Sequence, residues 1–410
     1  MTAFASADIL LPRGTDMGKW AVIACDQFTS QPDYWQQAAA LVGDAPSALK
    51  LILPEYRLSG DYEREIPAIH AAMERCLAEG LFAAYADSFV YVERTLLDGQ
   101  VRRGLVGAVD LESYDYGDSA ATPVRATERT VVERIPPRMK VRQGAALELP
   151  HVLLLCDDEE NAVVEPLTET KGGLPLLYDF DLMAGGGHIA GYLVSGEAAA
   201  RVRGALDRYE ARIRRRSGVE NPMLYAVGDG NHSLATAKAC WEAHKRQHPG
   251  EDLSRHPARY ALVELENLRD PCQEIDPIHR IVTHTDPAAL LARARREIGA
   301  EEGYAVPWRS GDRSGTLVLD PALGALPVGI LQGFLDRYLA ENPGQIDYIH
   351  DQLALEELAA AEGAIGFLLP AIGKEQLFGG IDRDGVLPRK TFSMGHAREK
   401  RYYLEARKIR

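Results

Sequence analysis

A strand, a glycine turn and a helix follow one another near the middle of the chain, and the turn has the residue types of an anion site. The apolar run at residues 223–227 predicts a short strand, and it leads into Gly228-Asp229-Gly230-Asn231-His232-Ser233. Residues 231–248 have apolar side chains at three- and four-residue spacing, which predicts a helix. The first amides of a helix have no partner within it and lie at the positive end of its dipole, so they favour an anion such as phosphate.

Each residue of this turn has a role in such a site. The two glycines let the backbone approach a ligand closely, and Asn231 or Ser233 can cap the helix. His232 can donate a hydrogen bond to a phosphate oxygen. Asp229 can bind a metal ion, accept a hydroxyl proton or hold a ribose. The same residues also fit a capped helix start in which the histidine is incidental.

A second polar segment follows another apolar run. Residues 20–25 (WAVIAC) predict a buried strand, and Asp26 and Thr29 come directly after it. Polar residues at the carboxyl end of a strand are a usual place for substrate groups in α/β folds. Asp26, if buried, can act as a general base for an alcohol, and Thr29 can contact the substrate. A surface turn is the alternative, and Cys25 has no base in its local sequence that would make it a nucleophile.

A run of three glycines precedes His188 and fits the pattern G-x-G-x-x-A. A dinucleotide-binding turn should follow a strand and begin a helix. Residues 189–194 instead predict a strand, so we expect no such site here. His188 then either contacts substrate at the main site or lies in a hairpin turn.

Several segments resemble a known family. The run LYAVGDGNHSLATA at residues 224–237 resembles the Asp-Gly-His-His-Arg motif of a bacterial and archaeal family named domain of unknown function 1015. Other segments resemble that family in the same order, over nearly the whole chain: residues 77–81, 103–107, 126–130, 276–280, 347–351 and 388–392. The family's loop is in turn similar to the phosphate-binding loop of the ParB/sulfiredoxin-type fold. That group includes sulfiredoxin, CTP-binding ParB proteins and a free serine kinase that uses ADP.

The resemblance implies roles for individual loop residues. Asp229, Gly230 and His232 match the Asp, the Gly and the second His of the family's loop. Asn231 stands where the first His is usual, and Ser233 stands where Arg is usual. The Ser233 position therefore lacks a bidentate phosphate donor.

Residues in the other matching segments are candidates to complete the site. Arg280, Arg389 and Lys390 are candidates to bind phosphate and to supply the charge that is missing at position 233. Glu128 is a candidate to coordinate magnesium or to act as a base, and His279 is a candidate substrate contact. Surface salt bridges are the alternative for each charged residue.

The composition limits the partners of this chain. Its 46 Lys and Arg against 60 Asp and Glu give a net charge of −14, which argues against nucleic acid and anionic membranes as partners. The N-terminal residues have no basic leader segment, and the apolar run at residues 364–373 is too short to cross a bilayer. Five cysteines without a CxxC pair are typical of reduced thiols. We therefore expect a cytoplasmic protein with a small-molecule substrate, which can form a homo-oligomer.

Together these patterns predict an α/β (mixed α+β) protein with a ParB/sulfiredoxin-like core. We expect an N-terminal α/β region at residues 1–145, the core with the GDGNHS loop at 146–285, and a C-terminal α/β region at 286–410. The resemblance implies phosphoryl transfer with a nucleotide (ATP or ADP) and Mg²⁺ to a small hydroxyl metabolite such as free serine. A phosphatase for small phosphate esters and a non-catalytic nucleotide or metabolite sensor remain as alternatives.

Overall fold

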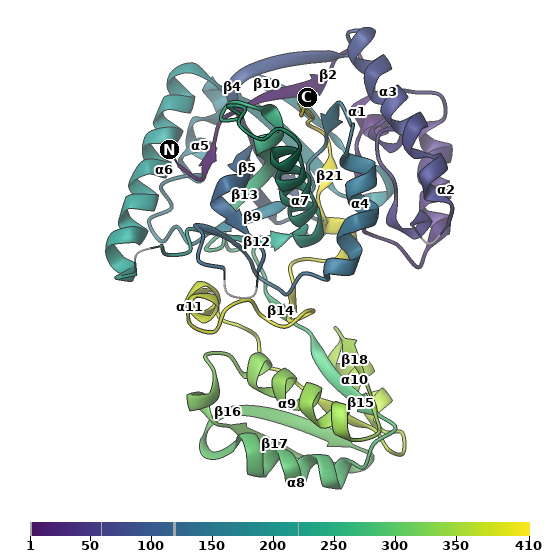
Figure 1. Cartoon of the computed structure of the whole chain (residues 1–410), viewed down its shortest axis with the longest axis vertical. Coiled ribbons are helices and arrows are strands. Elements are labelled where there is room, and N and C mark those ends of the chain that lie inside the picture. The colour runs from purple at the N-terminus through teal and green to yellow at the C-terminus, as the bar shows by residue number, and fades with distance from the viewer. Residues whose placement is uncertain (1, 59, 118–119, 220) are drawn as a thin grey trace. The chain divides into compact units, whose positions relative to one another are not determined.

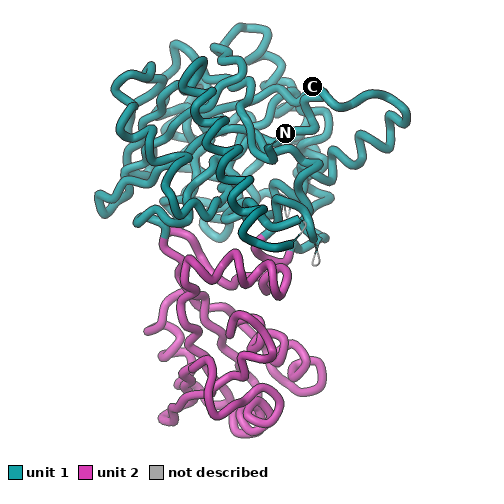
Figure 2. Tube along the Cα trace, turned by 90° about the vertical axis from the view of Figure 1, so that its left-hand side faces the viewer, with its two compact units in different colours: residues 1–126, 130–273, 396–410 teal, residues 127–129, 274–395 magenta. Residues whose placement is uncertain are grey.

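The computed structural model describes residues 2–58, 60–117, 120–219 and 221–410. The chain divides into two compact units, shown in different colours in Figure 2. Unit 1 comprises residues 1–126, 130–273 and 396–410, and unit 2 comprises residues 127–129 and 274–395. This division differs from the consecutive regions 1–145, 146–285 and 286–410 that we expected from the sequence, because strands that are distant in the chain pair with one another.

Unit 1 is built on a mixed sheet, which has eleven strands within the described residues. Its main path runs through β10 (Leu176–Asp181), β11 (His188–Val194), β4 (Phe82–Thr95), β5 (Val101–Asp110), β13 (Tyr260–Asn267), β9 (Leu153–Cys156), β12 (Tyr225–Asp229), β7 (Val124–Ala126) and β6 (Tyr114–Asp115). β1 (Phe4–Ala5) pairs with β5, and β2 (Ala7–Pro12) pairs with β4. β13 with β9, β12 with β7 and β6 with β7 are parallel, whereas the other pairs are antiparallel. The predicted mixed α/β class is confirmed.

The C-terminal residues return to unit 1. β21 (Tyr402–Tyr403) pairs with β3 (Val22–Ile23), and β22 (Arg407–Lys408) pairs with β8 (Leu147–Glu148). Tyr402 and Tyr403 are buried in the unit 1 core. These backbone bonds explain why residues 396–410 belong with the N-terminal elements and not with the region before them.

The helices of unit 1 are α1 (Met17–Trp20), α2 (Pro32–Val42), α3 (Ile66–Ala78), α4 (Ile135–Arg142), α5 (Pro166–Thr170), α6 (Gly196–Ser217) and α7 (Asn231–Gln247). The predicted helix at 231–248 is confirmed. β4 and β5 form a hairpin with Gly99 at φ 86° in its turn. The strand expected at 20–25 is wrong in extent. Asp16 caps α1, which ends at Trp20, and β3 covers two residues.

Apolar side chains fill both faces of the unit 1 sheet. Phe89 and Tyr91 of β4 belong to one buried cluster, and Val90 and Val92 belong to the other. Successive side chains of a strand point to opposite faces, so these two clusters cover the two sides of the sheet. No helix in the described part of the chain is long and apolar enough to cross a membrane.

Unit 2 contains an antiparallel sheet with the order β17 (Arg313–Leu319), β16 (Gly299–Ser310), β19 (Ile365–Phe367), β15 (His279–Thr283) and β18 (Gln345–Ile349) (Figure 1). Its helices are α8 (Pro287–Ile298), α9 (Pro327–Glu341), α10 (Gln352–Ala359) and α11 (Lys374–Asp384). A short pair joins β14 (Asp276–Pro277) to β20 (Phe392–Ser393). The sequence did not predict β16, because most of its side chains are exposed and it lacks a continuous apolar pattern.

Candidate functional site

The glycine turn joins β12 to α7 in unit 1, as predicted (Figure 1). Gly230 is the N-cap residue of α7, with φ 79° and ψ 26° in the left-handed region. A Cβ atom at this position would lie 3.0 Å from Cα of Val152, so both conformation and space require glycine. The expectation that Asn231 or Ser233 caps the helix is wrong, because the cap position belongs to a residue without a side chain.

Two amides at the start of α7 are available to a ligand. The N–H groups of Ser233 and Leu234 donate to the carbonyl oxygen of Gly230 at 3.0 and 3.1 Å. The N–H groups of Asn231 and His232 have no acceptor among the described residues. They lie at the positive end of a 17-residue helix, which is the arrangement that favours an anion.

Asp229 lies beside these amides and contacts a lysine from the C-terminal segment. Its Oδ1 accepts a hydrogen bond from the N–H of Gly230 at 3.0 Å, and its Oδ2 lies 3.4 Å from Nζ of Lys400. The Lys400 side chain is 12% exposed. Lys400 therefore brings a positive charge to the loop, and no sequence pattern indicates this contact.

His232 is neutral in this environment. Its Nε2 accepts a hydrogen bond from the N–H of Val131 at 3.3 Å, so in the neutral ring the proton is on Nδ1. Burial, reinforced by the guanidinium groups of Arg138 and Arg134, lowers the pKa of His232 to about 4, and the carboxylate of Asp26 opposes this shift. His232 can donate one neutral hydrogen bond to a ligand, which is weaker than the charge-assisted bond of an imidazolium.

The loop has basic neighbours in its own unit. α4 packs against α7, and Figure 1 shows the two helices side by side. Arg134 is exposed at the start of this region, and Arg138 pairs with Glu55 at 2.8 Å. Unit 1 thus supplies cations near the position where the family's loop has arginine. The basic run at residues 134–142 is the sequence feature that could have indicated them.

Of the two site residues predicted in the second polar segment, Asp26 and Thr29, only Asp26 lies near the same loop. Asp26 is close enough to His232 to influence its pKa, and its Oδ1 accepts from Nε2 of Gln27 at 3.1 Å. Thr29 is exposed in the turn that follows. The carboxylate therefore belongs with the loop residues, whereas no contact in the described part of the chain assigns Thr29 a role.

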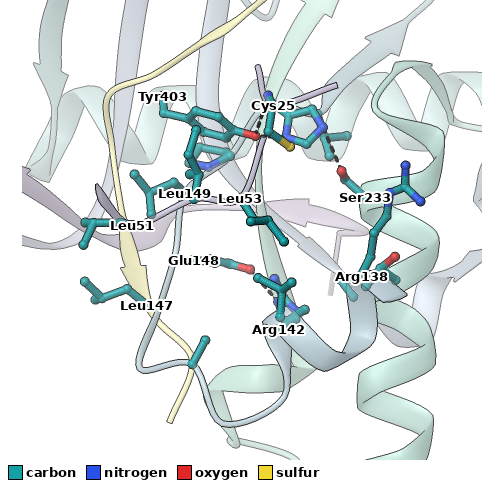
Figure 3. Close-up of a pocket in the computed structure, with 18 of the residues that line it drawn as sticks. Cys25, Leu51, Leu53, Arg138, Arg142, Leu147, Glu148, Leu149, Ser233 and Tyr403 are labelled. Carbon is teal, nitrogen blue, oxygen red and sulfur yellow. Dashed lines mark hydrogen bonds and ion pairs between the residues drawn. The ribbon is translucent and has the colours of Figure 1, made fainter. Parts of the chain in front are cut away.

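Ser233 is engaged in a different direction from the one expected. Its Oγ lies 2.7 Å from Nε2 of His151, and Nδ1 of His151 lies 2.8 Å from the hydroxyl of Tyr403. The N–H of Cys25 donates to the same Tyr403 hydroxyl at 3.1 Å. These four residues line a cavity of about 170 Å³ (Figure 3). Burial raises the pKa of the Cys25 thiol, so this thiol stays protonated.

Unit 2 contains a group of cations around one tyrosine ring, which we call the basic cluster: Arg280, Arg389, Lys390 and Tyr348. The guanidinium carbons of Arg280 and Arg389 lie 4.7 and 5.4 Å from the Tyr348 ring centre, and Nζ of Lys390 lies 5.3 Å from it. Nε of Arg389 also donates to the Tyr348 hydroxyl at 3.3 Å. Three predicted phosphate ligands therefore meet in one place, together with an aromatic residue that was not predicted.

Arg280 is the buried member of the basic cluster, with 0% of its surface exposed. Its Nε donates to Oε1 of Gln332 at 2.7 Å, and its Nη1 donates to the carbonyl oxygens of Ile278 and Lys390 at 2.6 and 2.9 Å. Its Nη2 has no hydrogen-bond partner among the described residues. Burial lowers the pKa of Arg280 to about 10, so the side chain is charged at neutral pH.

Glu128 holds the backbone of the same region. Its Oε2 accepts from the N–H of Lys390 at 3.0 Å, and its Oε1 accepts from the N–H groups of Thr391 and Phe392 at 2.9 and 3.4 Å. Burial raises the pKa of Glu128, while these amide bonds oppose the rise. Four segments that resemble the family, those containing Glu128, Arg280, Tyr348 and Lys390, are thus joined within unit 2.

The two predicted substrate histidines have other partners. Nδ1 of His279 accepts from the N–H of Leu369 at 3.2 Å, and His279 is 7% exposed. It also lines a cleft of unit 2 that contains Trp308 and Arg309. The half-exposed His188 lies between Asp179 and Asp181, at 2.6 and 2.8 Å, and hydrogen bonds to these carboxylates raise its pKa. His188 is therefore held by ion pairs across the β10–β11 hairpin.

The chain is distantly similar to several solved structures, whereas no curated protein matches it. A free serine kinase variant in complex with AMP is 12% identical, with 74% of this chain and 92% of that chain covered and a TM-score of 0.40. A conserved hypothetical protein from Pyrococcus furiosus is 12% identical over 73% of this chain and 90% of that chain, with a TM-score of 0.33. SbnI from Staphylococcus aureus with a C-terminal truncation is 8% identical over 71% and 82%, with a TM-score of 0.37. The model of the family described as "Protein of unknown function (DUF1015)" matches residues 9–408, and the chain belongs to this family.

Proposed function

We propose that the chain binds the phosphate groups of a nucleotide, ATP or ADP, at the N-terminus of α7 and transfers a phosphoryl group to a small hydroxyl-bearing metabolite such as free serine. The observation that supports this most directly is the pair of unpartnered amides at Asn231 and His232 behind a glycine in the left-handed conformation. Such amides suit a phosphate because they donate hydrogen bonds without needing to reorient. The ParB/sulfiredoxin-like character of the loop is part of this proposal.

The roles of the side chains follow from their positions. Nδ1–H of His232 donates to a phosphate oxygen, and Arg134 and Lys400 balance the phosphate charge. The hydroxyl oxygen of the metabolite forms a bond to phosphorus as the bond from phosphorus to the nucleotide's oxygen breaks. Asp26 accepts the hydroxyl proton in this scheme, because its carboxylate is near His232.

Magnesium fits this site only as a partner of the nucleotide. The described residues contain no group of three or more His, Cys, Asp or Glu side chains that could hold a metal ion. Magnesium is often held by one or two carboxylates together with substrate phosphates and water. Asp229 would hold the ion, which would supply positive charge to the transferring phosphoryl group.

The basic cluster of unit 2 is a second place for an anion in this proposal. Arg389 and Lys390 are exposed, so they can contact a ligand. The buried Arg280 donates a hydrogen bond to the Lys390 carbonyl oxygen and so holds this backbone in place. Both oxygens of Glu128 accept backbone N–H groups. We therefore assign Glu128 a positioning role instead of the role of base.

Calorimetry with ATP, ADP, CTP and phosphoserine tests the binding step, and phosphorus NMR with serine as the acceptor tests transfer. Lys400→Met should weaken nucleotide binding about tenfold or more, because a hydrogen bond to a charged group contributes about 1.5–3 kcal/mol. Lys408→Met is the matched control, since Lys408 is an exposed lysine of the same C-terminal segment. If the folded wild-type protein binds none of the four compounds, the proposal is wrong.

A further inference from the structure

The hydrogen-bonded chain from Ser233 through His151 to Tyr403 has the geometry of an activated serine. Ser233 Oγ and His151 Nε2 are 2.7 Å apart, which is within the range for a nucleophile and its base. His151 is 6% exposed and Tyr403 is 2% exposed, so both rings are largely shielded from solvent. Their rings are nearly perpendicular, at 87°, with centres 5.4 Å apart.

The hydrogen bonds among Ser233, His151 and Tyr403 can place their protons in the arrangement that a nucleophile needs. The Tyr403 hydroxyl accepts from the N–H of Cys25, and its oxygen has a second lone pair. It can therefore also accept from Nδ1–H of His151, which lies 2.8 Å away. In that arrangement Nε2 of His151 has a free lone pair and accepts the hydroxyl proton of Ser233.

The cavity beside Ser233 is small and mainly apolar. Its wall includes Leu51, Leu53, Leu147 and Leu149, and Figure 3 shows Tyr403, Cys25 and Ser233 along one edge of it. Its volume of about 170 Å³ is close to that of an engineered apolar cavity of about 150 Å³ that binds benzene. The cavity can thus hold an apolar group of about six heavy atoms.

The charged residues in the cavity wall are already paired. Arg142 lies 2.5 Å from Glu148, and Arg138 lies 2.8 Å from Glu55. A phosphoryl group in this cavity would need cations that are free to neutralise it. A neutral carbonyl group with a short apolar chain needs none, so the wall favours an acyl group over a phosphoryl group.

We propose that Ser233 is a nucleophile that accepts the acyl group of an ester with an apolar chain of about four to six carbons, with His151 as its base and Tyr403 as a positioning residue. Ser233 Oγ forms a bond to the carbonyl carbon while its proton passes to Nε2 of His151. The carbon–oxygen bond to the alcohol then breaks, and the alcohol leaves with that proton. Water reverses these steps on the acyl-serine, giving the free acid and restoring Ser233.

This activity goes beyond the proposed phosphoryl transfer and does not depend on it. Ser233 is the third residue of α7, and its hydroxyl is bonded to His151 at the edge of the cavity. Nucleotide binding uses the amides of Asn231 and His232 and does not use the Ser233 hydroxyl. A failure of one proposal therefore leaves the other unaffected.

The experiment uses the full chain with p-nitrophenyl butyrate and detects both p-nitrophenolate release and a butyryl adduct by mass spectrometry. We expect a rapid burst and an adduct on Ser233. Ser233→Ala should abolish both, whereas Ser254→Ala, which changes an exposed serine of the same unit, should leave both unchanged. Absence of an adduct on Ser233, or an equal burst from Ser233→Ala, would overturn the proposal.

Two further measurements separate this role from a structural one. Tyr403→Phe should lower the acylation rate about tenfold and shift its pH profile, because the hydrogen bond that orients His151 is lost. p-Nitrophenyl octanoate should react more slowly than butyrate, since its chain exceeds the cavity volume. Phosphorylation of Ser233 by p-nitrophenyl phosphate in place of acylation by the esters would refute the acyl class, and an unchanged pH profile would refute the role of Tyr403.

Discussion

The loop of unit 1 and the basic cluster of unit 2 offer positive potential to an anion in different ways. The loop uses the backbone amides of Asn231 and His232, and the nearest histidine is neutral. The basic cluster uses the side chains of Arg280, Arg389 and Lys390 around Tyr348. A site made of backbone amides tolerates changes of its side chains, whereas a site made of side chains does not.

This difference explains how the loop can keep its geometry despite its unusual residues. Asn231 and Ser233 replace residues that are usual in the family's loop, but the amides at these positions depend on the glycine turn and the helix. The hydroxyl of Ser233 is bonded to His151 instead of the loop. Charge near the loop comes from Arg134, Arg138 and Lys400 of the same unit.

The largest expected effect is on the stability of unit 2. Arg280→Met leaves the acceptors on Gln332, Ile278 and Lys390 without their buried donor, which should lower the free energy of unfolding by about 3 kcal/mol. Arg389→Met, at an exposed position, should change it by less than about 0.5 kcal/mol. Urea denaturation of the two variants checks this contrast, and equal losses would contradict the distinction between the buried and exposed arginines.

Gly230→Ala should have the next largest effect, and it acts on the loop. A non-glycine residue in this left-handed position is strained, and its Cβ would press on Val152, so we expect a loss of about 2 kcal/mol. Gly218→Ala is the matched control, because Gly218 has φ 68° and no atom within 4 Å of its Cβ position. Thermal unfolding of both variants measures the part due to Val152, and identical midpoints would show that this contact has no effect.

His232→Ala should weaken phosphate binding about two- to tenfold, because a neutral hydrogen bond contributes about 0.5–1.5 kcal/mol. An imidazolium would instead make a charge-assisted bond, and its removal would weaken binding about ten- to a hundredfold. His244→Ala changes another histidine of α7 and should leave the affinity unchanged. Calorimetry with ADP at neutral pH distinguishes the two values, and a loss of a hundredfold would mean that His232 is charged when the ligand binds.

The last contrast concerns two histidines with opposite pH dependence. The pKa of His232 falls from 6.5 to about 4 on folding, so the unfolded chain binds the proton more readily and stability is lost as pH falls from 6.5 towards 4. The pKa of His188 is raised, so its contribution is present below pH 6.5 and is lost as pH rises through its folded pKa. The His188 side chain is 41% exposed, so solvent screening should keep this contribution below about 1 kcal/mol.

Urea midpoints at pH 5 and pH 8 for His232→Gln and His188→Gln check these signs. His232→Gln should reduce the loss of stability at pH 5. His188→Gln should destabilise the protein more at pH 5 than at pH 8. The same sign for both variants would contradict the assignment.

Much of the strand–turn–helix arrangement follows from the sequence, because its causes are local. The apolar run before Gly228 favours a strand, Gly230 permits the left-handed turn, and the spacing in residues 231–248 favours a helix. The hairpin at Asp98-Gly99 is predictable for the same reason. Backbone preferences and side-chain periodicity within a few residues are sufficient in both cases.

Tertiary structure alone determined which distant residues join the loop and the basic cluster. Ser233 and His151 are separated by 82 residues, and His151 and Tyr403 are separated by 252. Lys400 reaches Asp229 because β21 pairs with β3, and Glu128 contacts Lys390 because the backbone N–H of Lys390 donates to its carboxylate. No local pattern encodes such contacts, since they depend on how buried strands pair. The sequence by itself thus specified a turn fit for an anion, while the packing of remote segments determined that His232 is neutral and that Ser233 faces a cavity.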